Sequence, residues 1–195
     1  MNWSFNEGKL MVAGKEIPLT SFRALTELRS VLKDKNATGP DPAYWVFRDI
    51  HDPDGPTGNR SDITVLAPGK IGEEYVKTHG HYHLGEGVEQ YRLLAGQGLL
   101  LLQKPSFNFT SVEAARLIHL PLGQLVSIPE GWGHTLINIG NSQLVTENYE
   151  PPTIEQLYSA YEKNHGAAFY VLEHDGKEKI EPNPHYPNEP KLQNF

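Results

Sequence analysis

Short apolar runs alternate with turn residues along the middle of the chain. The runs are rich in β-branched, leucine and aromatic side chains, and Gly- or Pro-containing turns separate them. The predicted strands are Ile63–Ala67, Glu74–Thr78, Glu89–Leu94, Leu99–Gln103, Ala114–Leu120, Leu125–Ile128, Thr135–Ile139 and Leu144–Tyr149. Many short strands at such spacing are typical of an all-β barrel or sandwich.

The flanking regions have a more mixed pattern. Apolar residues recur at steps of three and four in Thr20–Lys35, and Thr20 or Ser21 can cap the N-terminus. This pattern predicts a helix. A second helix is expected at Thr153–Lys163, behind a possible Thr153 cap. Two further strands are predicted at Tyr44–Ile50 and Ala167–Glu173. Asp52–Asp62 is expected to be a loop, and the Pro-rich tail from Glu181 to be irregular.

No fixed-period repeat, low-complexity tract or long linker divides the 195 residues. The length suits one core with elaborated ends. We therefore expect a single domain over residues 1–195, with the barrel core at about residues 44–150.

Composition narrows the possible partners and compartments. The net charge is −7 and no run of Lys or Arg is present, so a nucleic-acid partner is not expected. The longest apolar run, Leu99–Leu102, is far below the ~20 residues of a membrane-spanning helix. The N-terminal segment lacks the basic and apolar regions of a signal peptide. We expect a soluble, cytoplasmic protein. Because the chain has no cysteine, any metal must be bound by nitrogen and oxygen ligands.

The segment HGHYH contains three of the nine histidines. Side chains alternate between the two faces of a strand, so His79, His81 and His83 are expected on one face and Tyr82 on the other. Two imidazoles on one face at this spacing lie close enough to share a metal ion. His-x-His pairs are also common in polar turns that bind nothing, so the pair alone leaves both interpretations open.

Two more residues extend this candidate site. Glu89 follows His83 after LGEGV, whose glycines permit a tight turn that brings the chain back antiparallel. His134 comes much later and would supply a third nitrogen. Three imidazoles and a carboxylate suit first-row divalent ions. The sequence therefore predicts a metal site at His81, His83, Glu89 and His134.

The wider spacing resembles the two motifs of the cupin family. From His81 the chain follows H-x-H-x5-E-x6-G, and from Gly123 it follows G-x5-P-x-G-x2-H-x3-N. The second motif is complete. The first has one more residue than usual between the second His and the Glu, and Tyr75 stands where the motif begins with Gly. The resemblance implies a single-domain cupin, that is, a double-stranded β-helix or jelly-roll barrel with a few peripheral helices.

Three segments resemble the cupin-type glucose-6-phosphate isomerases of archaea and some bacteria. They are TVLAPGKIGEEYVKTHGHYH, VEQYRLLAGQGLLLLQ and PEGWGHTLINIG, and the resemblance covers roughly Ile63 to Tyr149. It implies a homodimeric enzyme of glycolysis and gluconeogenesis that interconverts glucose 6-phosphate and fructose 6-phosphate. The exposed N-terminal strands would be available for the dimer interface.

The resemblance also implies roles for single residues. His81, His83, Glu89 and His134 correspond to the family's metal ligands, with Fe(II) expected first and Mn(II), Ni(II), Zn(II) or Co(II) as alternatives. The corresponding phosphate- and sugar-binding positions are Thr64, Thr78 and Gly80. Tyr91 matches an active-site tyrosine and Tyr149 a tyrosine near the sugar. The family's substrate-contacting His shortly after that tyrosine has no counterpart before His165.

Other interpretations remain open at this point. Thr64, Thr78 and Tyr91 are also ordinary strand residues, Gly80 would relieve a crowded turn, and Lys70 would be a solvated turn residue. The chain could be a different metal-dependent cupin, such as another phosphosugar isomerase or a dioxygenase, or a non-enzymatic sugar-binding cupin. The sequence does not choose between proton transfer by Glu89 and a metal-assisted hydride shift.

Overall fold

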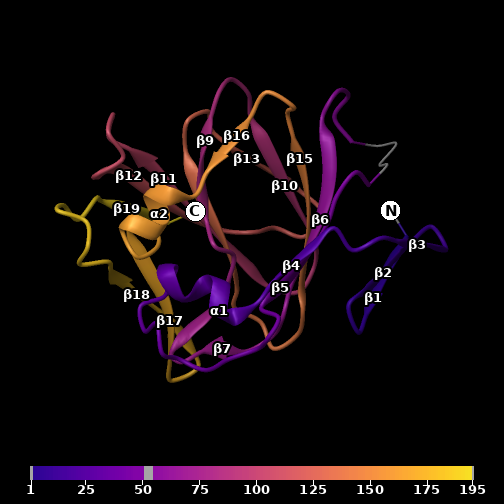
Figure 1. The fold of residues 1–195 in the computed structure, drawn as a ribbon, viewed down its shortest axis with the longest axis horizontal. Helices are drawn as coiled ribbons and strands as arrows, with labels where there is room; N and C mark the ends of the chain where they lie inside the picture. The colour runs from indigo at the N-terminus through magenta and orange to yellow at the C-terminus, as the bar shows by residue number, and fades with distance from the viewer. Residues whose placement is uncertain (1, 51–54, 195) are drawn as a thin grey trace.

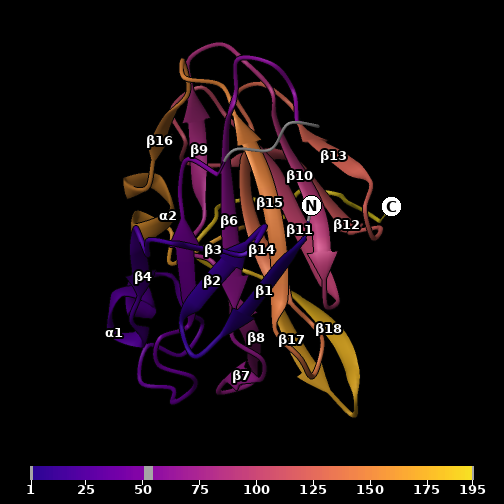
Figure 2. The same ribbon diagram turned by 90° about the vertical axis from the view of Figure 1, so that its right-hand side faces the viewer.

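The computed structural model describes residues 2–50 and 55–194, and its strands form three sheets. Two large sheets curl toward each other into a barrel, which Figures 1 and 2 show from two directions. The third sheet is a small N-terminal meander that lies outside the barrel beside β6 (Figure 1). It contains β1 (Trp3–Asn6), β2 (Lys9–Val12) and β3 (Lys15–Ile17). The predicted all-β barrel is confirmed.

The first large sheet has six antiparallel strands. In spatial order they are β13 (Leu125–Ile128), β10 (Glu89–Ala95), β15 (Leu144–Glu150), β6 (Arg60–Leu66), β5 (Tyr44–Phe47) and β4 (Ser21–Arg23).

The second large sheet has ten strands. Its main path is β18 (Lys177–Pro182), β17 (Phe169–His174), β8 (Glu74–Lys77), β14 (Gly133–Asn138), β11 (Gly98–Pro105), β12 (Val112–His119) and β19 (Leu192–Asn194). Three strands lie off this path: β7 (Lys70–Ile71) on β8, β9 (His81–Leu84) on β14, and β16 (Glu155–Leu157) on β9.

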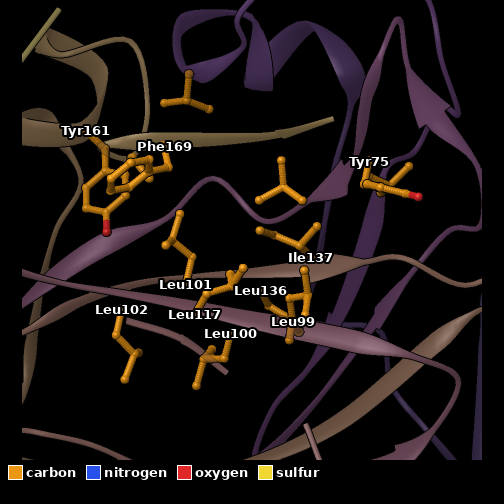
Figure 3. Close-up of a cluster of buried hydrophobic side chains, with 14 of the residues drawn as sticks. Tyr75, Leu99, Leu100, Leu101, Leu102, Leu117, Leu136, Ile137, Tyr161 and Phe169 are labelled. Carbon is orange, nitrogen blue, oxygen red and sulfur yellow. The ribbon is translucent and has the colours of Figure 1, made fainter. Parts of the chain in front are cut away.

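The leucine run in β11 lies between two apolar layers. Leu100 and Leu102 face one side of the strand, and Leu101 faces the other, toward Tyr161 and Phe169 (Figure 3). All three leucines are almost fully buried. A strand covered on both faces has no solvent-facing positions, which explains why this segment is continuously apolar instead of alternating.

The N-terminal meander covers the outer face of the six-stranded sheet. Leu10 and Val12 of β2 pack with Ile63 and Val65 of β6 in a second apolar cluster. These β6 side chains alternate with Asp62 and Thr64, which face the barrel interior. The alternation gives β6 one apolar outer face and one polar inner face.

The first predicted helix is much shorter than expected. Ser21–Arg23 form β4, and only α1 (Leu25–Leu28) is α-helical, followed by a 3₁₀ turn at Arg29–Val31. The backbone N–H of Leu25 donates to the Asp41 carboxylate at 3.0 Å, so the helix begins there and not at Thr20. Pairing with β5 holds the preceding residues in a strand.

The second predicted helix is also partly a strand. Glu155–Leu157 pair with the free edge of β9, and only α2 (Ser159–Lys163) is helical. The tail after Glu181 is irregular as expected, except that β18 extends to Pro182 and β19 pairs in parallel with β12. Within the expected loop Asp52–Asp62, residues 52–54 lie outside the described residues, and β6 already begins at Arg60.

Candidate metal centre and cavity

A cavity lies between the two large sheets. It opens to solvent, and its volume is about 570 Å³ with the open mouth included. Side chains of β4, β5, β6, β10 and β15 form one wall, and residues of β9 and β14 form the other. Gln156 and Tyr158 lie at the junction between β16 and α2 and complete the lining.

The four predicted metal ligands come together at this cavity. One potential ligand atom from each of them lies within 4.8 Å of all the others. His81 of β9 and His134 of β14 are direct cross-strand partners, and their ring centroids are 4.5 Å apart. His83 lies 5.0 Å from the His134 ring. Glu89 reaches the cluster from β10 in the opposite sheet, so the site joins both sheets.

A bulge between β8 and β9 determines which side chains face the cavity. Residues 78–80 oppose only residues 135–136 of β14, because the register shifts by one residue between the two strands. Gly80 has φ +80°, and a Cβ there would lie 2.5 Å from Thr135 Oγ1. The bulge allows both Thr78 and His81 to line the cavity. The sequence predicted strict alternation of side chains through HGHYH. The bulge interrupts that alternation between His79 and His81.

Several buried polar atoms of the four residues make no hydrogen bond. Within the described residues, His81 Nε2, both ring nitrogens of His83, Nδ1 of His134 and Oε2 of Glu89 make no hydrogen bond. Buried polar atoms are normally paired, so such a group of unpaired atoms at one point is the signature expected of a cation site. The donor set of imidazole nitrogens and one carboxylate oxygen fits a first-row divalent ion.

Burial determines the protonation of these groups. Desolvation, with the other histidines of the cluster contributing, lowers the pKa of His81 and of His134 well below the usual value. Both imidazoles are therefore neutral and have a lone pair available for a metal. Burial raises the pKa of Glu89, and His83 and Asn148 oppose that rise. Burial also raises the pKa of Tyr91 well above its usual value, so its hydroxyl keeps its proton.

The predicted substrate-binding residues divide into two groups. Thr64, Thr78, Gly80 and Tyr91 all line the cavity. Thr78 Oγ1 accepts the backbone N–H of Leu136 at 3.0 Å, which leaves its hydroxyl proton free to be donated.

Tyr149 does not line the cavity. It lies on the opposite face of β15 from Asn148, and its hydroxyl accepts a hydrogen bond from Arg92 at 2.5 Å. The structure brings Asn148, the preceding residue, to the cavity instead.

His79 lines the cavity but stays outside the ligand cluster. Its Nδ1 lies 3.1 Å from the Gly80 carbonyl oxygen and its Nε2 lies 3.5 Å from Glu162. Lys70 forms an ion pair with Glu173 away from the cavity, as expected of a turn residue.

The sequence interpretation missed two cations in the cavity. Arg48 Nη1 forms an ion pair with Asp62 at 2.9 Å, and Arg23 pairs with Glu27 at 3.1 Å and lies 3.4 Å from the Tyr44 hydroxyl. Both guanidinium groups keep further N–H donors, since each has five. Arg48 follows directly on β5 and Arg23 ends β4. Only the pairing of β4 with β5, and of β5 with β6, could have placed them at the site.

A family model described as glucose-6-phosphate isomerase matches residues 21–188. The chain belongs to this family. It is therefore an aldose–ketose isomerase of the cupin type, and the predicted family and activity are confirmed. The match extends well beyond the Ile63–Tyr149 region of the resemblance, since it includes β4, β5, β17 and β18.

Individual relatives agree with the family model. The glucose-6-phosphate isomerase of Thermococcus onnurineus (strain NA1) is 29% identical over 83% of this chain and 85% of its own length. That of Pyrococcus abyssi (strain GE5 / Orsay) is 32% identical over 93% of each chain. A solved structure described as a cupin-like protein from Thermotoga maritima is 21% identical and covers 58% of this chain and 75% of its own, with a TM-score of 0.37.

Among the described residues, no helix of this isomerase is long and apolar enough to cross a membrane. The cytoplasmic location expected from the sequence stays a prediction.

Proposed function

We propose that His81, His83, Glu89 and His134 hold one divalent ion per chain in this isomerase. The support is that one potential ligand atom from each of the four residues lies within 4.8 Å of all the others, and that several buried polar atoms of the cluster make no hydrogen bond among the described residues. We expect Fe(II), and the same nitrogen and oxygen donors accept Mn(II), Ni(II), Zn(II) and Co(II). When bound, the ion would polarise the sugar carbonyl and stabilise the enediolate that develops from it.

Glu89 and Tyr91 are proposed to move the protons. In the direction from fructose 6-phosphate, Glu89 takes a proton from C1 and returns it to C2. Tyr91 mediates the transfer of the hydroxyl proton from O1 to O2. The two side chains lie two residues apart on one face of β10, and both line the cavity. In the rival route, hydride moves directly between C1 and C2, and Glu89 or Tyr91 moves hydroxyl protons only.

The phosphate is proposed to bind at Thr64, Thr78, Gly80, Arg23 and Arg48. Hydroxyl and guanidinium donors match phosphate oxygens, and charged donors form the stronger hydrogen bonds. The ion pair with Asp62 holds the Arg48 guanidinium in the wall of the cavity while its other N–H groups stay available. These two arginines extend the neutral phosphate site implied by the sequence.

The single observation that carries the proposal is that one cavity combines a buried cluster of three histidines and one glutamate with two guanidinium groups. A phosphorylated sugar is complementary to both, because its oxygens face the cation and its phosphate faces the arginines. The test is a coupled assay with fructose 6-phosphate and, in parallel, free fructose. We expect turnover of the phosphorylated sugar and little or none of free fructose. Equal use of both sugars would overturn the proposed phosphate site.

We also propose that the isomerase is a homodimer. The support is the outermost strand of the six-stranded sheet, β4, whose outer edge makes no strand pairing within the described residues. Phe22 on that strand is 51% exposed, although it is a large apolar side chain. Light scattering on a size-exclusion column would give twice the chain mass, and the mass of one chain would contradict the proposal.

A further inference from the structure

Asn148 lies beside Glu89 in the wall of the cavity. On β15 it is the cross-strand partner of Tyr91 on one side and of Asp62 on the other. Glu89 precedes Tyr91 by two residues and shares its face of β10, so Asn148 and Glu89 are diagonal neighbours. The Asn148 Nδ2 group donates to Glu89 Oε1 at 2.7 Å, and both side chains are at least 95% buried.

This contact makes the two oxygens of Glu89 different. Oε1 accepts the hydrogen bond from Asn148. Oε2 lies 3.0 Å from His83 Nε2 and 3.8 Å from His134 Nε2, and it has no hydrogen-bond partner among the described residues. Oε1 is thus hydrogen-bonded to β15 in the barrel wall, and Oε2 is directed at the histidines.

The two neighbouring buried carboxylates, Asp62 and Glu150, have arginine partners, whereas Glu89 does not. Asp62 pairs with Arg48 and Arg60, and Glu150 pairs with Arg60. The donor to Glu89 is a neutral amide. A cationic partner would offset the negative charge of Glu89 and repel a divalent ion nearby, whereas an amide does neither. Of these three carboxylates, only Glu89 is not paired with an arginine, so its negative charge remains available to the ligand cluster.

We infer that Asn148 is the positioning residue of Glu89. Its hydrogen bond to Oε1 directs Oε2 toward the position an ion would take, and it would keep the carboxylate in place while Glu89 acts on the sugar. The two roles proposed for Glu89, as ligand and as base, require such an anchor that does not depend on the ion. The inference rests on the proposed metal site and adds a residue that acts through Glu89 without touching the ion.

The test is a double-mutant cycle read by metal affinity. Co(II) is titrated into metal-stripped protein and followed by its visible absorption, for the wild type, Asn148→Ala, Glu89→Ala and the double variant. Loss of a group that orients a metal ligand typically costs about 10–100-fold in affinity. We expect such a loss for Asn148→Ala in the wild-type background, and less than about a threefold change when Glu89 is already Ala.

Thr146→Val is the matched control. Thr146 is buried on the same strand and face, and its hydroxyl has no hydrogen-bond partner among the described residues. Its cross-strand partner on β10 is Leu93, four residues after Glu89. It should leave Co(II) affinity unchanged. Melting of each metal-stripped variant checks the fold, and Asn148→Leu, which keeps the volume, replaces the Ala variant if that one unfolds.

A second measurement separates positioning from packing. Asn148→Ala should lower kcat for fructose 6-phosphate by at least tenfold while KM changes less than about threefold, because the phosphate site is intact. Wild-type Co(II) affinity in Asn148→Ala, or an equal loss in the Glu89→Ala background, would overturn the inference. Failure of the proposed function would give a different result, because the wild type itself would then not convert fructose 6-phosphate.

Discussion

The Tyr91 hydroxyl oxygen lies 3.1 Å from Nε2 of His134. The two residues belong to β10 and β14, which are in different sheets, so this contact marks the point where the walls of the barrel meet. A substrate oxygen that approaches the ligand cluster from the cavity would therefore also approach a protonated tyrosine hydroxyl. This arrangement is the basis for assigning the hydroxyl proton transfer to Tyr91.

Removing a single imidazole should remove the metal without unfolding the protein. We expect His81→Ala and His134→Ala to retain less than a tenth of the metal of the wild type, because each removes a proposed ligand. The fold should survive, because the barrel has an extensive apolar core. Elemental analysis measures the metal, and circular dichroism checks the fold. His174→Ala is the control, since His174 is exposed at the end of β17. Full metal content in both cavity variants would rule out this ligand set.

Glu89→Gln tests the base. The substitution keeps the shape and one weak oxygen ligand but removes the proton acceptor. We expect kcat to fall by about 10²–10⁴-fold with the metal content restored. Turnover of the wild type in D₂O should place deuterium on C2 of glucose 6-phosphate. Near-normal turnover of the variant together with no deuterium on carbon would instead favour the hydride shift.

The phosphate contacts should affect KM more than metal content. Thr64→Val, Thr78→Val and Arg48→Met each remove donors that we assign to the phosphate. A hydrogen bond to a charged group contributes about 1.5–3 kcal/mol, so each variant should raise KM for fructose 6-phosphate by roughly 10–100-fold. Metal content, measured on the same samples, should stay at the wild-type level. Unchanged KM in both threonine variants would mean that these residues only pack the strands.

A buried ion pair next to the bulge should matter for stability. Lys77 Nζ pairs with Glu74 at 2.6 Å and also donates to the Val31 carbonyl, and both charged side chains are nearly inaccessible. Lys77→Met leaves the Glu74 carboxylate buried without its cation, so the free energy of unfolding should fall by about 3–5 kcal/mol. Chemical denaturation measures it. The exposed pair Lys104–Glu113 supplies the control, because Lys104→Met should change stability by less than about 1 kcal/mol.

The strand pattern and the clustering of the four proposed ligands could be predicted from sequence because both depend on the spacing within motifs. Leu125–Ile128 begins and ends where the punctuation by Gly and Pro indicated. The His81, His83, Glu89 and His134 spacing was sufficient because two motifs with fixed turns bring their strands together. The expected single domain over residues 1–195 stays a prediction.

The features that could not be predicted from the sequence depend on pairing between strands that lie far apart in the chain. Arg23 enters the cavity only because Ser21–Arg23 pair with β5, whereas the local apolar period there indicated a helix. Asn148 and Tyr149 are neighbours in the chain, and the strand register decides which of them faces the cavity. The one-residue shift between β8 and β9 likewise has no local signal beyond Gly80.

The most direct test of the central claim is a metal titration of activity. Metal-stripped protein receives Fe(II) under anaerobic conditions in steps of a fraction of an equivalent per chain, and conversion of fructose 6-phosphate is measured after each step. The account predicts no turnover at the start, a linear rise, and a plateau at one ion per chain, with the titration abolished in His134→Ala. Full activity of the stripped protein, or a rise that continues well past one equivalent, would contradict it.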